Sequence, residues 1–132
     1  MVVIKMTGRV VHFEIPVDDE KRAKDFYTKA FGWKMSPVPN MEYTMVGTTP
    51  SDENGMPSEP GAINGGMMVR QGPVKNPVVT IAVPDIENAL KEVVKLGGKV
   101  IIGKTSVGDM GFSAYIKDTE GNIVGLWQLA KQ

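Results

Sequence analysis

The sequence contains no cysteine among its 132 residues. This absence excludes disulfide bonds, zinc sites built from thiolates and cysteine nucleophiles together. Lysine plus arginine equal aspartate plus glutamate at 15 each, so there is no strong field of one sign to attract nucleic acid or an anionic membrane. We therefore expect a small-molecule ligand as partner, and neither a nucleic acid nor a membrane.

Long hydrophobic runs are also missing. No apolar run reaches the length of a membrane span, and the opening MVVIKMTGR carries two charges and too short an apolar run for a signal peptide. A chain of 132 residues that is 42% hydrophobic has the size of one domain and enough apolar material for a core. The sequence thus predicts a single domain over residues 1–132, located in the cytoplasm.

The only histidine of the chain lies in the stretch VVHFEIPVDD. Apolar side chains alternate there with polar ones, which is the period of a β-strand: Val11, Phe13 and Ile15 against His12 and Glu14. A strand would place His12 and Glu14 on one face and the apolar set on the other.

Amphipathic stripes predict helices near residues 19–31 and 85–96, and the remaining alternating segments predict strands, one of them at 99–102. The second half repeats the first with a displacement of 66 positions. The matched pairs are Ile15 and Ile81, Val17 and Val83, Asp19 and Asp85, Ala23 and Ala89, and Gly32 and Gly98. Each half reads strand, helix and three strands, so we expect two βαβββ modules, approximately at residues 8–70 and 76–130.

The first strand of each half should bury its apolar face beneath the helix that follows it. The side chains expected under the helices are Val11, Phe13, Ile15, Val79, Ile81 and Val83.

Three segments resemble the vicinal oxygen chelate superfamily, which includes glyoxalase I, extradiol dioxygenases and bleomycin-resistance proteins: HFEIPVDDEKRAKDFYTKAFGWK, VTIAVPDIENALKEVVKLGGKV and YIKDTEGNIVGLWQ. Among its members, the chain is most similar to the small glyoxalase-like proteins. The resemblance implies an α+β fold in which two βαβββ modules form curved mixed sheets around a cavity, with the helices on the outer face. It also implies a homodimer. Because this superfamily hosts many reactions on one scaffold, the resemblance does not specify the chemistry.

In metal-using members of this superfamily the ligands lie on the first and last strands of each module, and His12 falls at the first such position. Val78 stands at the equivalent position of the second half, and Gly125 stands where a carboxylate belongs. The fourth position falls around Gly66 or Met67. His12 is therefore the one candidate metal ligand. We expect no tightly bound cofactor, and a weakly held divalent metal is the disfavoured alternative.

His12 and Glu14 are the candidate catalytic residues. In one interpretation Glu14 holds the imidazole while His12 moves a proton on a bound ligand. In the simpler interpretation the two side chains only satisfy each other's hydrogen bonds inside the fold.

Three further residues are candidates for ligand binding. Thr80 and Trp127 share the strand parity of the family's inward-facing positions, so we expect them to line a cavity with His12 and Glu14. Trp127 could stack on a planar ligand, and Met67 could form an adaptable wall. Simple packing is the alternative for both of these side chains.

These observations favour a small-molecule-binding protein of the glyoxalase and bleomycin-resistance superfamily, with proton transfer at His12 and Glu14 as its candidate chemistry. The alternative is an enzyme, namely a glyoxalase-type, metal-dependent lyase or isomerase that acts on a small oxygenated metabolite.

Overall fold

The computed structural model describes residues 7–130. Its backbone forms two compact units: Val11–Val79, and the described residues of Met1–Val10 and Thr80–Gln132. Arg9 belongs with the second unit, where its carbonyl accepts a hydrogen bond from the backbone of Ala82 at 2.9 Å. That the two units make up one domain stays a prediction.

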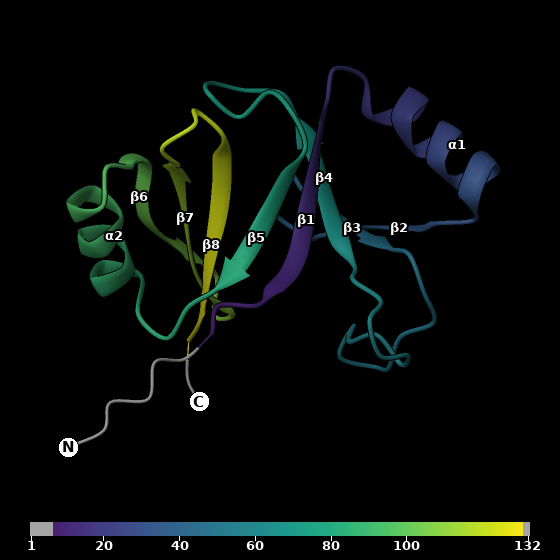
Figure 1. The fold of residues 1–132 in the computed structure, drawn as a ribbon. Helices are drawn as coiled ribbons and strands as arrows, with labels where there is room; N and C mark the ends of the chain where they lie inside the picture. Colours follow the sequence, from purple (N-terminus) through teal and green to yellow (C-terminus); the bar gives the residue numbers. More distant parts are fainter. Residues whose placement is uncertain (1–6, 131–132) are drawn as a thin grey trace. The chain divides into compact units, whose positions relative to one another are not determined.

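Each half of the chain contains a strand, a helix and three further strands (Figure 1), so the α+β fold with two βαβββ modules is confirmed. The first module consists of β1 (Val10–Val17), α1 (Glu20–Phe31), β2 (Lys34–Pro37), β3 (Thr44–Gly47) and β4 (Gly65–Val69). The second consists of β5 (Val78–Ala82), α2 (Ile86–Lys95), β6 (Lys99–Val107), β7 (Gly111–Lys117) and β8 (Ile123–Leu129).

The strands of the first module follow the order β2-β3-β4-β1. β1 and β4 run parallel, and the other two pairs are antiparallel. The register of the parallel pair sets Glu14 opposite Gly66 and Ile15 opposite Met67. β4, the last strand of the module, therefore lies directly beside the part of β1 that carries Glu14.

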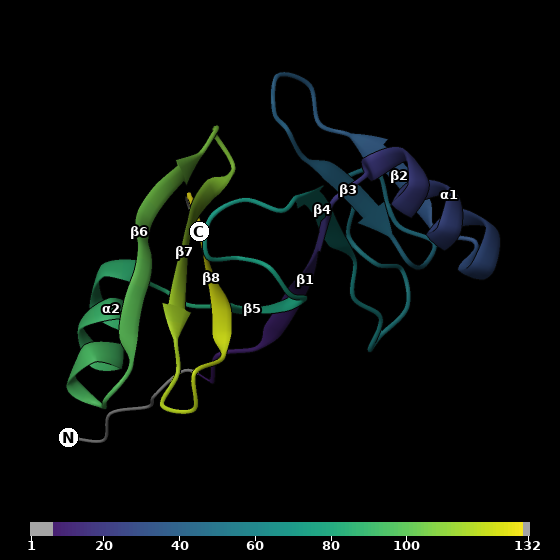
Figure 2. The ribbon, with the colours of Figure 1, turned by 90° about the horizontal axis from the view of Figure 1, so that it is seen from above.

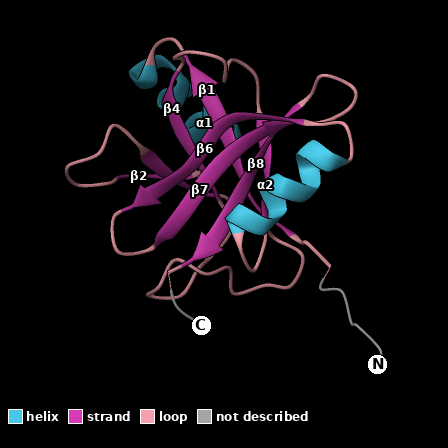
Figure 3. Cartoon of the chain, turned by 90° about the vertical axis from the view of Figure 1, so that its left-hand side faces the viewer, coloured by secondary structure: helices cyan, strands magenta, loops and turns pink. Residues whose placement is uncertain are grey.

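The second module repeats this arrangement in the order β5-β8-β7-β6, with β5 and β8 parallel and Thr80 opposite Gly125. Figure 3 shows β6, β7 and β8 side by side, with α2 next to them. β6 extends to Val107, so the prediction that this strand ends at residue 102 is wrong. Pairing with β7 continues past two irregularities in register, which shows that the partner strand, rather than local propensity, fixes the length of β6.

Both helices begin at an aspartate whose side chain caps them. Asp19 accepts a hydrogen bond from the backbone of Arg22 at 3.0 Å, and Asp85 accepts one from Glu87 at 2.9 Å. Gly32 ends α1 in the left-handed conformation, with φ of 74°, which costs glycine little. Neither helix among residues 7–130 is long and apolar enough to cross a membrane.

Each module has its own apolar core between its helix and its sheet; Figure 2 shows α2 along one side of its strands. The first core consists of Val17, Val46 and Met67, packed against Phe13, Ile15, Ala23, Tyr27, Trp33 and Met35. The second consists of Ile86, Ala114, Ile116 and Leu126, packed against Ile81, Val83, Ala89, Leu90, Val93, Phe112 and Val124.

The predicted helix-facing residues Phe13, Ile15, Ile81 and Val83 pack in these cores. The prediction was wrong for Val11 and Val79, the first residue expected under each helix, because they are 37% and 49% exposed. Both lie near the start of their strands, before the residues that pack with the helix. Alternation identifies the face on which a side chain lies, but not where along the strand the helix begins to cover it.

Candidate functional site

His12 and Glu14 lie on the same face of β1, as the alternation predicts, and a third side chain joins them. Tyr43, the residue before β3, places its hydroxyl 2.8 Å from the Nε2 atom of His12. The same hydroxyl donates a hydrogen bond to the Oε2 atom of Glu14 at 2.7 Å. Imidazole, phenol and carboxyl group therefore form one continuous hydrogen-bonded chain.

The directions of these hydrogen bonds determine which ring nitrogen of His12 carries a hydrogen. A phenol has a single hydrogen, and Tyr43 gives it to Glu14. The phenol oxygen must then accept from His12, so the Nε2 atom carries a hydrogen. In the neutral imidazole the Nδ1 atom is consequently the one with a free lone pair.

A glycine makes room for the phenol. A Cβ atom added at Gly66 would overlap the hydroxyl and the ring of Tyr43, so no other residue fits at position 66 with the phenol in place. Sequence reasoning missed Tyr43. A glycine within a strand marks a close approach by another group, so the pair Gly65 and Gly66 was the signal that could have indicated such a contact.

Burial favours the neutral form of the His12 imidazole. Glu14 is 8% exposed and His12 is half-buried. Burial lowers the pKa of His12 below its ordinary value, and the negative charge of Glu14 offsets part of this effect by raising the pKa. The neutral imidazole is therefore the favoured form at neutral pH, as a proton acceptor requires.

This lowered pKa predicts that the protein loses stability on mild acidification. As the pH falls below about 6.5, the unfolded imidazole binds a proton while the folded one does not, so protons favour unfolding. The loss is complete once the pH is below the pKa of the folded state. Urea unfolding between about pH 8 and pH 5 should show a free energy of unfolding that declines more in the wild type than in His12→Gln. Identical declines in the two proteins would contradict the assignment.

The second module has a related but simpler arrangement. Thr80 is 7% exposed, and a Cβ atom at Gly125 would lie 2.8 Å from its Oγ1 atom. Thr80 thus occupies the position of Glu14, and Gly125 that of Gly66. Val78, the counterpart of His12, is buried and offers no donor atom.

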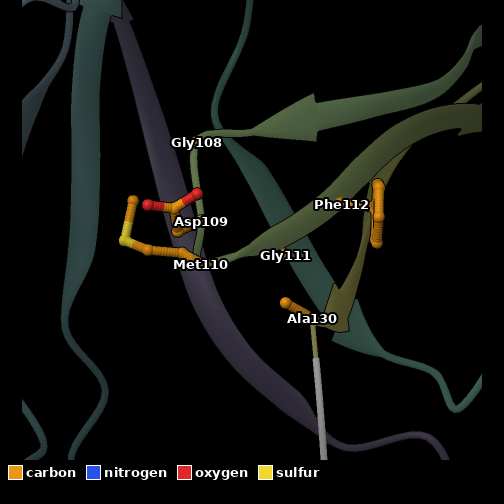
Figure 4. A pocket seen from close by; sticks show the side chains of 6 residues that line it. All are labelled: Gly108, Asp109, Met110, Gly111, Phe112 and Ala130. Atoms are coloured by element: carbon orange, nitrogen blue, oxygen red, sulfur yellow. The ribbon is translucent and has the colours of Figure 1, made fainter.

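Trp127 lies beside a hollow at the end of the second module. A Cβ atom at Gly111 would be 3.0 Å from the Cζ2 atom of Trp127, so the indole ring packs against a glycine that lines this hollow. Figure 4 shows the side chains of Asp109 and Met110 extending to the same side of the β6–β7 turn. The hollow measures about 630 Å³ and is lined by Gly108, Asp109, Met110, Gly111, Phe112 and Ala130.

Met67 is placed differently from the other candidate ligand-binding residues. It is 0% exposed and belongs to the core between α1 and the first sheet. Trp33 lies in the same core, where its ring stacks on Tyr27 with centroids 4.8 Å apart. This placement favours the packing alternative for Met67 over a wall of a ligand site.

The candidates are thus distributed over both units. His12 and Glu14 are brought together in the first unit by Tyr43, whereas Thr80 and Trp127 belong to the second. That all four line one cavity stays a prediction.

The described side chains bring together two candidate ligands for a divalent metal, His12 and Glu14. Among residues 7–130, no group of three or more histidine, cysteine, aspartate and glutamate side chains could hold a metal ion. His12 and Glu14 supply two donors and are already bonded through Tyr43, whose phenol fills the space at Gly66. A protein site with only two such ligands would leave most of the coordination to water.

Comparison with known proteins identifies the family. A family model described as bleomycin resistance protein-like N-terminal matches residues 9–49. A "Glyoxylase-like domain-containing protein" of Didymella fabae is 32% identical over 120 residues, which cover 87% of this chain and 89% of that protein. "Putative glyoxylase CFP32" of Mycobacterium bovis is 34% identical over 120 residues, again 87% of this chain, but the match spans only 43% of that longer protein.

Solved structures agree on the fold. Methylmalonyl-CoA epimerase from Mycobacterium tuberculosis superposes with a TM-score of 0.60 at 13% identity, covering 91% of this chain and 87% of that one. At this level of identity the similarity shows the fold alone. From the shared fold and the similarity to the glyoxylase-like relatives, we conclude that the chain belongs to the vicinal oxygen chelate superfamily of glyoxalases and bleomycin-resistance proteins.

Proposed function

We propose that the chain binds a small oxygenated molecule and that His12, supported by Glu14, moves a proton on it. The observation that carries this proposal is the hydrogen-bonded chain from His12 through Tyr43 to Glu14. An effective general base has a pKa near the working pH and is deprotonated there, and burial keeps His12 neutral. When His12 accepts a proton, the nearby carboxylate stabilises the imidazolium that forms.

The proposed reaction is removal and return of a hydrogen on a carbon beside a carbonyl group. An epimerase is among the proteins that share this fold, and inversion of such a carbon needs this proton transfer. His12 would take the carbon-bound proton, and the electron pair of the broken C–H bond would move onto the carbonyl oxygen as an enolate. Return of a proton to carbon completes the cycle, so the reaction needs no redox partner.

Solvent hydrogen exchange tests this proposal. Protein treated with a chelator is incubated in D₂O with methylmalonyl-CoA or with the hemithioacetal of methylglyoxal and glutathione, and deuterium uptake is followed by mass spectrometry. We expect uptake above the protein-free rate for at least one compound. Absence of uptake for both compounds, with and without added metal, would contradict proton transfer at a carbonyl-adjacent carbon.

The second candidate function is a glyoxalase-type, metal-dependent lyase or isomerase. One observation favours it, because relatives of this chain carry glyoxylase names. Elemental analysis of protein purified without chelator separates the two candidates. One zinc, nickel, iron or manganese per chain, lost in His12→Ala, with activity that needs this metal, would favour the metal enzyme.

We also propose that the chain forms a homodimer. β6 ends the strand order of the second module, and its Val100 and Ile102 are 40% and 37% exposed. An end strand with apolar side chains is a surface that a second copy can cover. Light scattering should give about twice the 14.3 kDa of the chain, and a 14.3 kDa species at micromolar concentration would contradict the dimer.

A further inference from the structure

We propose that Tyr43 is a positioning residue of this site: its hydroxyl holds the His12 imidazole in the Nε2–H tautomer, which leaves Nδ1 as the atom that accepts a proton from a bound molecule. The use of Nδ1 rests on the function proposed above. The tautomer itself is a property of the protein without any ligand, so the two proposals can fail separately.

The geometry assigns this role to the phenol and not to Glu14 alone. His12 and Glu14 are two residues apart on a strand, so their Cα atoms are about 7 Å apart and their side chains stand side by side. The hydroxyl of Tyr43 bridges them with bonds of 2.8 and 2.7 Å. A hydrogen bond to a carboxylate is stronger than one to a neutral nitrogen, so the phenol hydrogen remains on the Glu14 side. The imidazole must then donate from Nε2.

The position of the Tyr43 phenol also depends on Gly66. This glycine lies opposite Glu14 in the register of β1 and β4, and a side chain there would occupy the volume that the phenol now fills. Glycine weakens a strand because it gains nothing from packing and loses more conformational freedom than other residues. Its presence at this position is explained by the phenol that it admits.

If the role of Tyr43 were purely structural, its hydroxyl would serve only to donate a hydrogen bond to the buried carboxylate of Glu14. In that case the phenol could be removed with no effect on the hydrogen of the imidazole, provided that the chain still folds. The tautomer of His12 therefore distinguishes positioning from packing.

The experiment uses the fact that His12 is the only histidine of the chain. In the ¹⁵N-labelled 132-residue chain, long-range proton–nitrogen spectra give one set of ring signals, and their nitrogen shifts report which ring nitrogen carries the hydrogen. Spectra are recorded at a pH well above the ordinary histidine value of about 6.5, where the ring is neutral. The same protein in denaturant supplies the tautomer ratio of a free side chain.

We expect the wild type to be in the Nε2–H form to a greater extent than the denatured chain. In Tyr43→Phe the ratio of Nε2–H to Nδ1–H should fall about tenfold toward the denatured value, the factor expected for the loss of one hydrogen bond. Tyr27→Phe is the matched control, because it removes a phenol hydroxyl from the same module on the core side. Its ratio should equal that of the wild type.

Gly66→Ala should reproduce the tautomer change with Tyr43 still present, because the added methyl group displaces the phenol. Gly47→Ala is its control, since a Cβ atom there meets only Lys34, at an ordinary 3.6 Å. An Nδ1–H tautomer in the wild type, or an unchanged ratio in folded Tyr43→Phe, would overturn the inference. A confirmed tautomer without any solvent exchange would instead refute the proposed function and leave the role of Tyr43 intact.

Discussion

Replacing His12 with glutamine is expected to slow deuterium uptake into a bound carbonyl compound by about 10²–10⁴-fold, the usual contribution of a general base. Glutamine keeps a polar side chain of similar length, but it cannot take a proton at neutral pH. The rate is measured by mass spectrometry in D₂O, at saturating concentration of whichever compound exchanges in the wild type.

Tyr27→Phe serves again as the control, because Tyr27 packs in the core of the first module and not in the hydrogen-bonded chain. Its exchange rate should match that of the wild type. If His12→Gln also exchanges at the wild-type rate, His12 is not the base, and the imidazole only satisfies hydrogen bonds within the fold.

Replacing Met67 with alanine is expected to lower the free energy of unfolding by about 2–5 kcal/mol, as large-to-small substitutions in a core do. Met67 is 0% exposed and packs between α1 and the first sheet, so truncation leaves a cavity there. Chemical denaturation at constant pH measures the change.

Met56→Ala is the matched control, since Met56 is 61% exposed in the segment before β4. Its effect should remain within about 0.5 kcal/mol, as for most surface substitutions. A Met67→Ala protein that keeps its stability but loses exchange activity would place Met67 in the ligand site after all.

Much of the fold could be predicted because it depends on local patterns. Alternation around His12 identified β1 and its polar face, and amphipathic stripes placed helices near residues 19–31 and 85–96, close to the observed α1 and α2. The displacement of 66 positions between the halves reflects two modules with the same element order. These features need only a few neighbouring residues to be recognised.

The remaining features depend on contacts between distant parts of the chain. Tyr43 is 31 positions from His12 and 29 from Glu14, and no local period connects them. The extension of β6 depends on its partner β7, and the exposure of Val11 depends on where α1 crosses the sheet. In each case tertiary packing, rather than local preference, determines the outcome.

The most direct measurement is a titration in which the exchanging compound is added and the ring signals of the single histidine are followed. It tests whether a bound molecule contacts the His12 imidazole. We expect these signals to shift and to saturate at the same ligand concentration as the exchange rate. Ring signals that stay unchanged while exchange proceeds at its full rate would show that the reaction takes place elsewhere on the chain, and would contradict the role assigned to His12.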